Sequence, residues 1–141
     1  MPVRVSFQVQ NLDTAATRML VGSDGILVQH VARALRAIAN RAKILAPVDY
    51  GVLRNSHYTE PPKVSGHKVL GYVGNSAYYA SYVHDGTQPH VIRPRNARVL
   101  AWGGDPPTVF ARVVHHPGTA PRPWLANAAR MEGARLGFTD T

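Results

Sequence analysis

One amphipathic stretch constrains the fold of this chain more than any other feature. Between Ile26 and Ala46 the apolar residues recur every three or four positions, which is typical of a helix with one buried face. That stripe consists of Leu27, Val31, Ala34, Ile38, Ala42 and Leu45. A wholly polar stripe, which we interpret as a solvated face, consists of Gln29, Arg33, Arg36, Asn40 and Lys43. Pro47 ends the helix, because the residue before a proline is disfavoured in the helical region.

Short segments with strand character occupy much of the remaining chain. Strands are predicted at Val3–Val9, Val52–Thr59, Lys68–Gly74, His90–Arg93, Arg98–Trp102 and Val109–His115. Residues 61–67 and 103–107 are rich in glycine and proline and predict loops. Ala77–Val83 fits either a short helix or an irregular turn. A short helix is predicted at Asp13–Val21, and a last one at Trp124–Arg135 after a linker whose Pro123 suits a first helical turn.

The order helix, strands, helix predicts an α+β fold. We expect the long N-terminal helix and the C-terminal helix to pack on one face of a mostly antiparallel sheet of about four to five strands. The chain has 141 residues, of which 45% are hydrophobic, and this predicts a single domain over residues 1–141.

Composition narrows the compartment and the chemistry. The absence of cysteine excludes disulfides, thiolate metal sites and thiol nucleophiles. No apolar run approaches the roughly 20 residues of a membrane-spanning helix, and the first residues do not resemble a signal peptide. These features predict a soluble protein that is made and used in the bacterial cytoplasm.

Candidate catalytic and metal-binding residues do not form a known pattern. The adjacent His115 and His116 would point to opposite faces of a strand, and His84 has no second histidine at ligand spacing. The acidic residues form no close pair of the kind that acid–base or two-metal chemistry uses. Gly103 and Gly104 lack the lysine of a phosphate-binding loop. We therefore expect no enzyme, cofactor or metal site.

The charge is strongly basic. The chain carries 16 Lys+Arg against 8 Asp+Glu, a net charge of +8, which makes nucleic acid and acidic protein surfaces plausible neighbours. Arg93, Arg95 and Arg98 cluster in one turn, and Tyr78, Tyr79 and Tyr82 lie close together upstream. Tyrosines at this spacing either stack on bases or pack in a core or interface. A basic DNA-binding accessory protein is therefore one function to consider, and a metal-dependent hydrolase is another class to test.

Three segments carry turn and helix-start residues. The first, APVDYGVLRNS (residues 46–56), holds Pro47, Asp49, Gly51 and Leu53. Asp49 is expected to bond backbone amides two residues on, and Gly51 to permit a tight turn. The second, YASYVHDGT (79–87), ends in the chain reversal Gly86-Thr87. The third, from His116 to Ala128, holds Pro117, Gly118, Pro123, Trp124 and Leu125, of which the last two are expected to anchor the final helix.

Together these segments resemble the tail-completion or neck proteins of long-tailed double-stranded DNA bacteriophages. The family patterns are "APVDTG-x-L-R-x-S", "YA-x-YV-E-x-GT" and "HPGT…PFL-x-x-A", and the resemblance spans about residues 25–135. Tyr50, His84 and Trp124 stand where the family has a small hydroxyl residue, Glu and Phe.

The resemblance implies a virion structural protein, assembled in the host cytoplasm, that forms a ring in the neck. Such a hexameric or dodecameric homo-oligomer joins the head-tail connector or stopper to the tail tube or terminator, with non-specific contact to packaged DNA. A tail terminator or minor capsid role are alternatives within the same virion. Because exposed aromatics and arginines are enriched at interfaces, we predict that eight residues make the subunit or ring contacts: Tyr78, Tyr79, Tyr82, Arg93, Arg95, Arg98, Asp105 and Thr108.

Overall fold

The computed structural model describes residues 2–8 (by their backbone path), 19–20, 22, 25–66 and 68–137. The elements in chain order are β1 (Pro2–Gln8), α2 (Ile26–Leu45), α3 (Val52–Asn55), β2 (His57–Ser65), β3 (Lys68–Asn75), α4 (Ala80–Asp85), β4 (His90–Ile92), β5 (Leu100–Trp102), β6 (Val109–Ala111), β7 (Val114–His116) and α5 (Trp124–Arg135). The predicted α+β class, with its long first helix, C-terminal helix and antiparallel strands, is confirmed. The strands, however, are divided over three small sheets.

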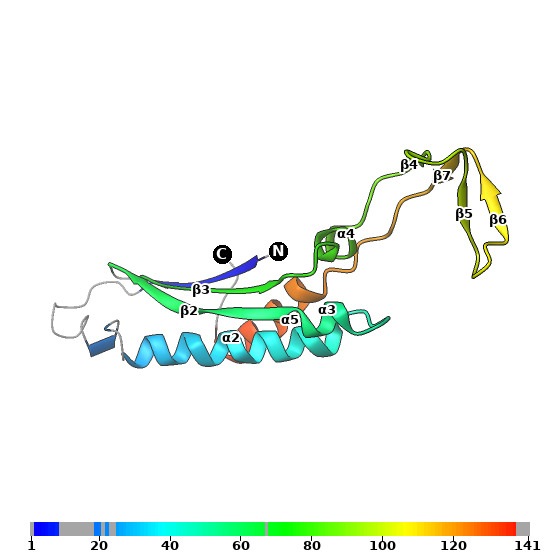
Figure 1. Cartoon of the computed structure of the whole chain (residues 1–141). Helices are drawn as coiled ribbons and strands as arrows, with labels where there is room; N and C mark the ends of the chain where they lie inside the picture. Colours follow the sequence, from blue (N-terminus) through cyan, green and yellow to red (C-terminus); the bar gives the residue numbers. More distant parts are fainter. Residues whose placement is uncertain (1, 9–18, 21, 23–24, 67, 138–141) are drawn as a thin grey trace.

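The body of the molecule consists of one three-stranded sheet and the two long helices (Figure 1). The sheet has the order β1-β3-β2 with antiparallel neighbours, so β3 is central. Val69 and Val73 of β3 are fully buried, and Leu70 and Tyr72 on the other face are half-buried, as the alternation predicts. Helix α2 packs on β2 and β3 and runs beside α5, so the helices and the sheet share one core.

Helix α2 forms where its sequence pattern predicts, except that Leu45, which was placed in the apolar stripe, is exposed. Val31, Ala34, Leu35, Ile38 and Ala42 are almost completely buried, whereas the polar stripe is exposed for most of its length. The helix ends at Leu45, and Ala46 adopts the extended ψ of 133° that a following proline favours.

The predicted strand at Val52–Thr59 is right only for its last three residues, and the loop predicted at 61–67 is wrong as far as Ser65. Val52–Asn55 is the short helix α3, and strand β2 runs from His57 through Pro61 and Pro62 to Ser65. A proline cannot donate a ladder hydrogen bond, but β2 is an edge strand, and its register shifts between Glu60 and Lys63. The edge position therefore permits a strand where the proline pair predicted a loop.

The strand prediction at Val109–His115 also needs correction. This segment contains two strands, β6 and β7, separated at Arg112 and Val113, because each half pairs with a different partner. The predicted strands at His90–Arg93 and Arg98–Trp102 form as β4 and β5 but do not pair with each other: β4 pairs with β7 and β5 with β6. Ala77–Val83, which the pattern left undecided, contributes helix α4.

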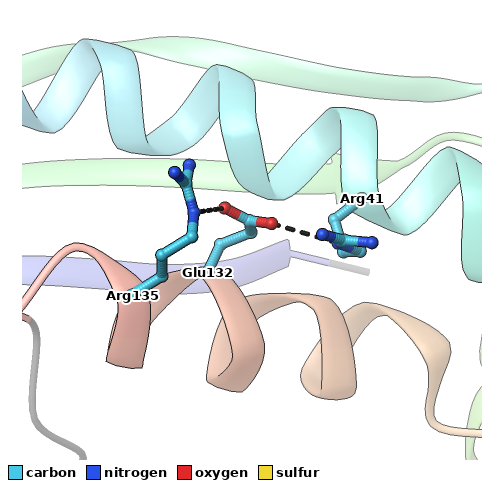
Figure 2. Close-up of polar contacts among 3 residues, drawn as sticks. All are labelled: Arg41, Glu132 and Arg135. Carbon is cyan, nitrogen blue, oxygen red and sulfur yellow. Dashed lines mark hydrogen bonds and ion pairs between the residues drawn. The ribbon is translucent and has the colours of Figure 1, made fainter.

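A buried ionic contact ties the C-terminal half of α5 to α2 (Figure 2). Oε1 of Glu132 accepts a hydrogen bond from Nε of Arg41 at 3.0 Å, and its Oε2 accepts one from Nε of Arg135 at 2.8 Å. These two hydrogen bonds, from Arg135 and then Arg41, hold the pKa of Glu132 below its usual value despite its burial. The carboxylate is therefore compensated in the core, and one residue links the two helices.

Two sequence predictions concern segments with little described structure. The helix predicted at Asp13–Val21 lies outside the described residues except for Met19 and Leu20, which are helical. The strand predicted at Val3–Val9 is confirmed as β1 over its described length. Among the described residues, no helix is long and apolar enough to cross a bilayer.

Candidate assembly surface

The chain between Gly86 and Pro121 leaves the body as an extended arm (Figure 1). The arm contains two antiparallel ladders of three residue pairs each, β4 with β7 near the body and β5 with β6 at the far end. The arm bends between the ladders, and neither ladder packs extensively on the helices or the three-stranded sheet. Residues 101–110 are all exposed. The arm therefore lacks a core of its own.

Apolar side chains cover both faces of the terminal hairpin. Because paired residues of an antiparallel ladder share a face, Trp102 and Val109 lie together, and Phe110 lies with Ala101 on the opposite face. Trp102 is 44% exposed and Phe110 is 61% exposed. An isolated two-stranded hairpin is marginally stable in water, so a surface that covers these side chains would stabilise it.

The loop at the tip of the hairpin contains the predicted contact residues Asp105 and Thr108. The backbone N–H of Thr108 donates to the carbonyl of Trp102, and its hydroxyl donates to the carbonyl of Gly103, both at 3.1 Å. Asp105 is exposed and precedes a cis peptide bond to Pro106. Thr108 thus closes the loop, while Asp105 lies on its surface.

The second and third sequence segments meet at the neck of the arm. Thr87 and Thr119 form a bridge in which each backbone N–H donates to the other's carbonyl, at 3.0 and 3.1 Å. Gly86 and Gly118, which precede them, have φ of 75° and 88°. A Cβ on either glycine would collide with the carbonyl oxygen of the opposite threonine. Both Gly-Thr pairs are therefore required by one close backbone crossing, with Pro117 exposed beside it.

All three segments converge on Trp124, the first residue of α5. Its indole N–H donates to Nε2 of His57 at 2.9 Å, and Nδ1 of His57 donates to the carbonyl of Arg54 at 2.9 Å. His84 contacts the indole edge-on, with 5.2 Å between ring centroids, and its Nδ1 donates to Asp85 at 2.6 Å. Trp124 is 4% exposed. His84, which precedes the arm, and Trp124, which follows it, thus pack together, and Trp124 is bonded to His57 of the body.

The hydrogen bonds of His57 define its protonation state. Nδ1 donates and Nε2 accepts, so the neutral Nδ1–H tautomer satisfies both partners. Burial lowers the pKa of His57, the bond to the Arg54 carbonyl opposes this, and the charge of Lys43 adds to the lowering. The neutral form is the one that holds Trp124.

The first segment forms the turn between α2 and α3. Gly51 has a φ of 80°, as expected for a tight turn, and Leu53 is buried. Nδ2 of Asn75 donates to the Leu53 carbonyl at 2.7 Å, which ties this turn to the end of β3. The bond predicted for Asp49 is not formed within the described part of the chain, where its side chain is exposed.

The predicted tyrosines differ in their surroundings. Tyr78 is 89% exposed and Tyr82 is 60% exposed, at the root of the arm. Tyr79 is half-buried against the core, and its ring contacts that of Tyr78 edge-on with 5.2 Å between centroids. Tyr78 and Tyr82 are thus available to a partner, whereas Tyr79 also supports the fold.

A largely apolar groove of about 560 Å³ lies beside the neck. Leu45 and Pro47 line it from the end of α2, and Pro123, Trp124 and Met131 line it from α5. Pro123 precedes the helix as its N-cap, and the adjoining Leu125 is fully buried. Trp124 and Leu125, which were predicted to anchor the final helix, are both buried in the core.

The groove and the arm do not assemble recognisable reactive groups. Within the described residues no three of the His, Asp and Glu side chains are grouped as metal ligands. The two histidines that face each other across β4 and β7, His90 and His116, stack at 4.9 Å. Nδ1 of His116 accepts from the Gly118 N–H, so this ring helps to shape the neck.

Comparison with known proteins gives no family assignment: no family model, no curated protein and no solved structure matches this chain.

Sequence reasoning missed three contributors to this region. His57 follows the first segment directly, but nothing in the pattern shows that it meets Trp124 across 67 residues. Trp102 and Phe110 were placed on strands without a partner surface. Their alternation on two short strands between turn-rich loops is the signal that would have marked an exposed hairpin.

Proposed function

We propose that this chain is a structural subunit of a tailed-phage virion that assembles into a ring in the neck and joins the DNA-filled head to the tail. The observation that carries the proposal is the convergence of the three family-like segments. They lie up to 82 positions apart, from Ala46 to Ala128. The first segment is linked to Trp124 of the third by the Arg54–His57–Trp124 hydrogen bonds, the second contacts Trp124 through His84, and the second and third cross at Gly86 and Gly118. Their shared role is to fix the root of an arm whose apolar side chains are exposed.

A closed ring needs two different contact surfaces on each subunit, because its contacts run head to tail. The arm offers one such surface in Trp102, Val109 and Phe110. The body offers the groove beside Trp124 and the exposed Tyr78 and Tyr82. We propose that the hairpin of one subunit packs against the groove and the exposed tyrosines of the next subunit or against a neighbouring ring.

Deletion of the gene tests the proposal directly. We expect unjoined heads and tails, and cryo-electron microscopy of complete virions should locate the chain between them in six or twelve copies, as in the family that it resembles. Location at the tail end of the neck or on the head shell would distinguish the terminator and minor capsid alternatives. Particles that mature normally and stay joined without the gene would refute the neck function.

Point variants test the contact surface. Replacing Tyr78 and Tyr82 together by Ala should reduce the yield of joined particles at least about tenfold, because exposed aromatics dominate interface energies. Tyr50→Thr is the matched control, since Tyr50 is also an exposed tyrosine and the family-like pattern has a small hydroxyl residue there. Equal yields from the double variant and the control would exclude the tyrosines as contacts.

A further inference from the structure

Half of the net charge of the chain lies in the arm and its root. Residues 86–122 contain five arginines (Arg93, Arg95, Arg98, Arg112 and Arg122) and one acid, Asp105. Five positive charges minus one give +4 over 37 residues, against +8 over all 141. The arm therefore carries a strong excess of positive charge, equal to that of helix α2, which holds Arg33, Arg36, Arg41 and Lys43 and no acidic residue.

Four of these arginines come together at the bend between the two ladders. The first ladder ends at the pair Ile92–Val114 and the second begins at Leu100–Ala111. Arg93, Arg95 and Arg98 lie in the loop of residues 93–99, and Arg112 lies in the two-residue gap opposite. We call these four residues the arginine elbow.

The elbow arginines have no anionic partner in the described structure. All four are exposed, and none of their guanidinium groups forms a hydrogen bond or ion pair with a described residue. In the body, Arg41 and Arg135 bond Glu132 and Lys63 pairs with Glu60, whereas Arg33 and Arg36 on the polar face of α2 are exposed and form no ion pair with a described residue. The elbow thus carries four unneutralised charges within nine residues, 93–99 and 112–113.

We propose that the arginine elbow binds the phosphate backbone of duplex DNA. Duplex DNA carries about one negative charge per 1.7 Å of its axis, so it offers a phosphate to each of several neighbouring arginines. Folded protein surfaces intersperse both signs of charge, and so offer fewer anions to four adjacent arginines. Guanidinium groups also bind phosphate oxygens in a bidentate manner.

The shape of the arm supports the same ligand. A two-stranded antiparallel ribbon is one of the elements that the major groove of DNA admits. DNA binding by the arm is independent of ring formation and holds for a subunit of any assembly.

Fluorescence anisotropy with a labelled 30-base-pair duplex of arbitrary sequence tests the proposal, using the full chain at 50–300 mM KCl. Four phosphate contacts predict a slope of about −3.6 in a plot of log K against log salt concentration. Replacing the four elbow arginines by Gln should remove most of that slope and weaken binding about 100-fold or more at 100 mM KCl. Replacing them by Lys should retain most of the slope, because the charges remain.

The matched control removes four exposed charges from the body, unpaired among the described residues: Arg33→Gln, Arg36→Gln, Arg54→Gln and Lys68→Gln. It should change the slope by less than about one. Equal weakening by the elbow and body variants would overturn the proposal, and so would wild-type binding by the elbow variant. Competition by polyglutamate as effective as that of DNA at equal charge would also overturn it, and would identify an acidic protein surface as the partner.

Folding and assembly are measured on the same samples. Circular dichroism melting should be unchanged in the elbow variant, because none of its four side chains contributes to the core. Light scattering then separates this proposal from the neck function. An elbow variant that assembles like the wild type but has lost DNA binding supports the elbow proposal whatever the location of the chain in a virion.

Discussion

The body and the arm differ in how far they bury their apolar side chains. In the body, α2, β3 and α5 surround Val31, Leu35, Val69 and Leu125, which are essentially inaccessible to solvent. In the arm, short ladders hold their backbones together while Trp102, Val109 and Phe110 remain exposed. The body therefore has the burial that makes a fold stable alone, and the arm has the exposure that makes a partner favourable.

The two tryptophans show the same difference in burial. Trp124 is 4% exposed and donates a hydrogen bond to His57, whereas Trp102 is 44% exposed. Burial of the Trp124 indole stabilises the fold, whereas the Trp102 indole remains available for burial against a partner.

Replacing Trp124 by Ala should have the largest effect on stability. Loss of a buried aromatic side chain costs about 3–5 kcal/mol, here together with the bond to His57. Trp102→Ala should lower the free energy of unfolding of the isolated subunit by less than about 0.5 kcal/mol while reducing its assembly. Urea unfolding of both variants measures the contrast. A loss of several kcal/mol in a monomeric Trp102→Ala protein would show that the arm does contribute to folding.

A single added methyl group should destabilise the Gly86–Gly118 crossing where the arm leaves the body. In Gly118→Ala the new Cβ collides with the Thr87 carbonyl at a φ of 88°, so the Thr87–Thr119 bridge should open. We expect a local cost of about 1–3 kcal/mol, seen as at least tenfold faster hydrogen exchange at the amides of Thr87 and Thr119. Amides in α2 should be unaffected.

Gly66→Ala is the control for that substitution. Gly66 has a similarly positive φ of 58° but no atom within 4 Å of the new Cβ. It should show the conformational cost of about 1–2 kcal/mol in the hairpin between β2 and β3, with no change at the neck. If both variants left the exchange at Thr87 and Thr119 unchanged, the close crossing would not be what holds the arm.

Much of the body followed from the sequence because its signals are local. The 26–46 helix was set by the spacing of apolar residues and ended by Pro47, and the faces of β3 by alternation. The last helix was recognised from Trp124 and Leu125 after a proline linker. Gly86-Thr87 was predicted as a chain reversal; the structure instead has it cross Gly118-Thr119 where the arm leaves the body, a pairing that the sequence did not show.

The errors and omissions lie where partners are distant. Whether Pro61 and Pro62 break a strand depends on the edge position of β2, which a proline pair does not reveal. The sequence of Val109–His115 predicts one strand, but its first part pairs with β5 and its last part with β4. The links from His57 to Trp124 and from Glu132 to Arg41 join positions 67 and 91 residues apart, beyond any local pattern.

Acid should weaken the attachment of α5 to the body in two separate steps. The first involves His57, whose pKa in the folded protein lies below 6.5 chiefly because of burial. Protonation therefore favours the unfolded chain, and the contribution of His57 to stability is complete above pH 6.5 and declines as the pH falls toward the lowered pKa. The second involves Glu132, whose contribution is complete above pH 4.5 and declines below it, because its arginine bonds also lower its pKa.

Variants that remove each group distinguish the two steps. Protonated His57 presents a hydrogen to the indole N–H of Trp124, so the bond between them is lost, at a cost of about 1 kcal/mol. Trp124→Phe lacks that bond at every pH, and its stability should therefore fall less than that of the wild type between pH 7.5 and 5.5. Glu132→Gln should retain the first decline but lose part of the one below pH 4.5. Urea titrations at a series of pH values measure both effects. Parallel curves for Trp124→Phe and wild type would mean that the His57–Trp124 bond does not control the first step.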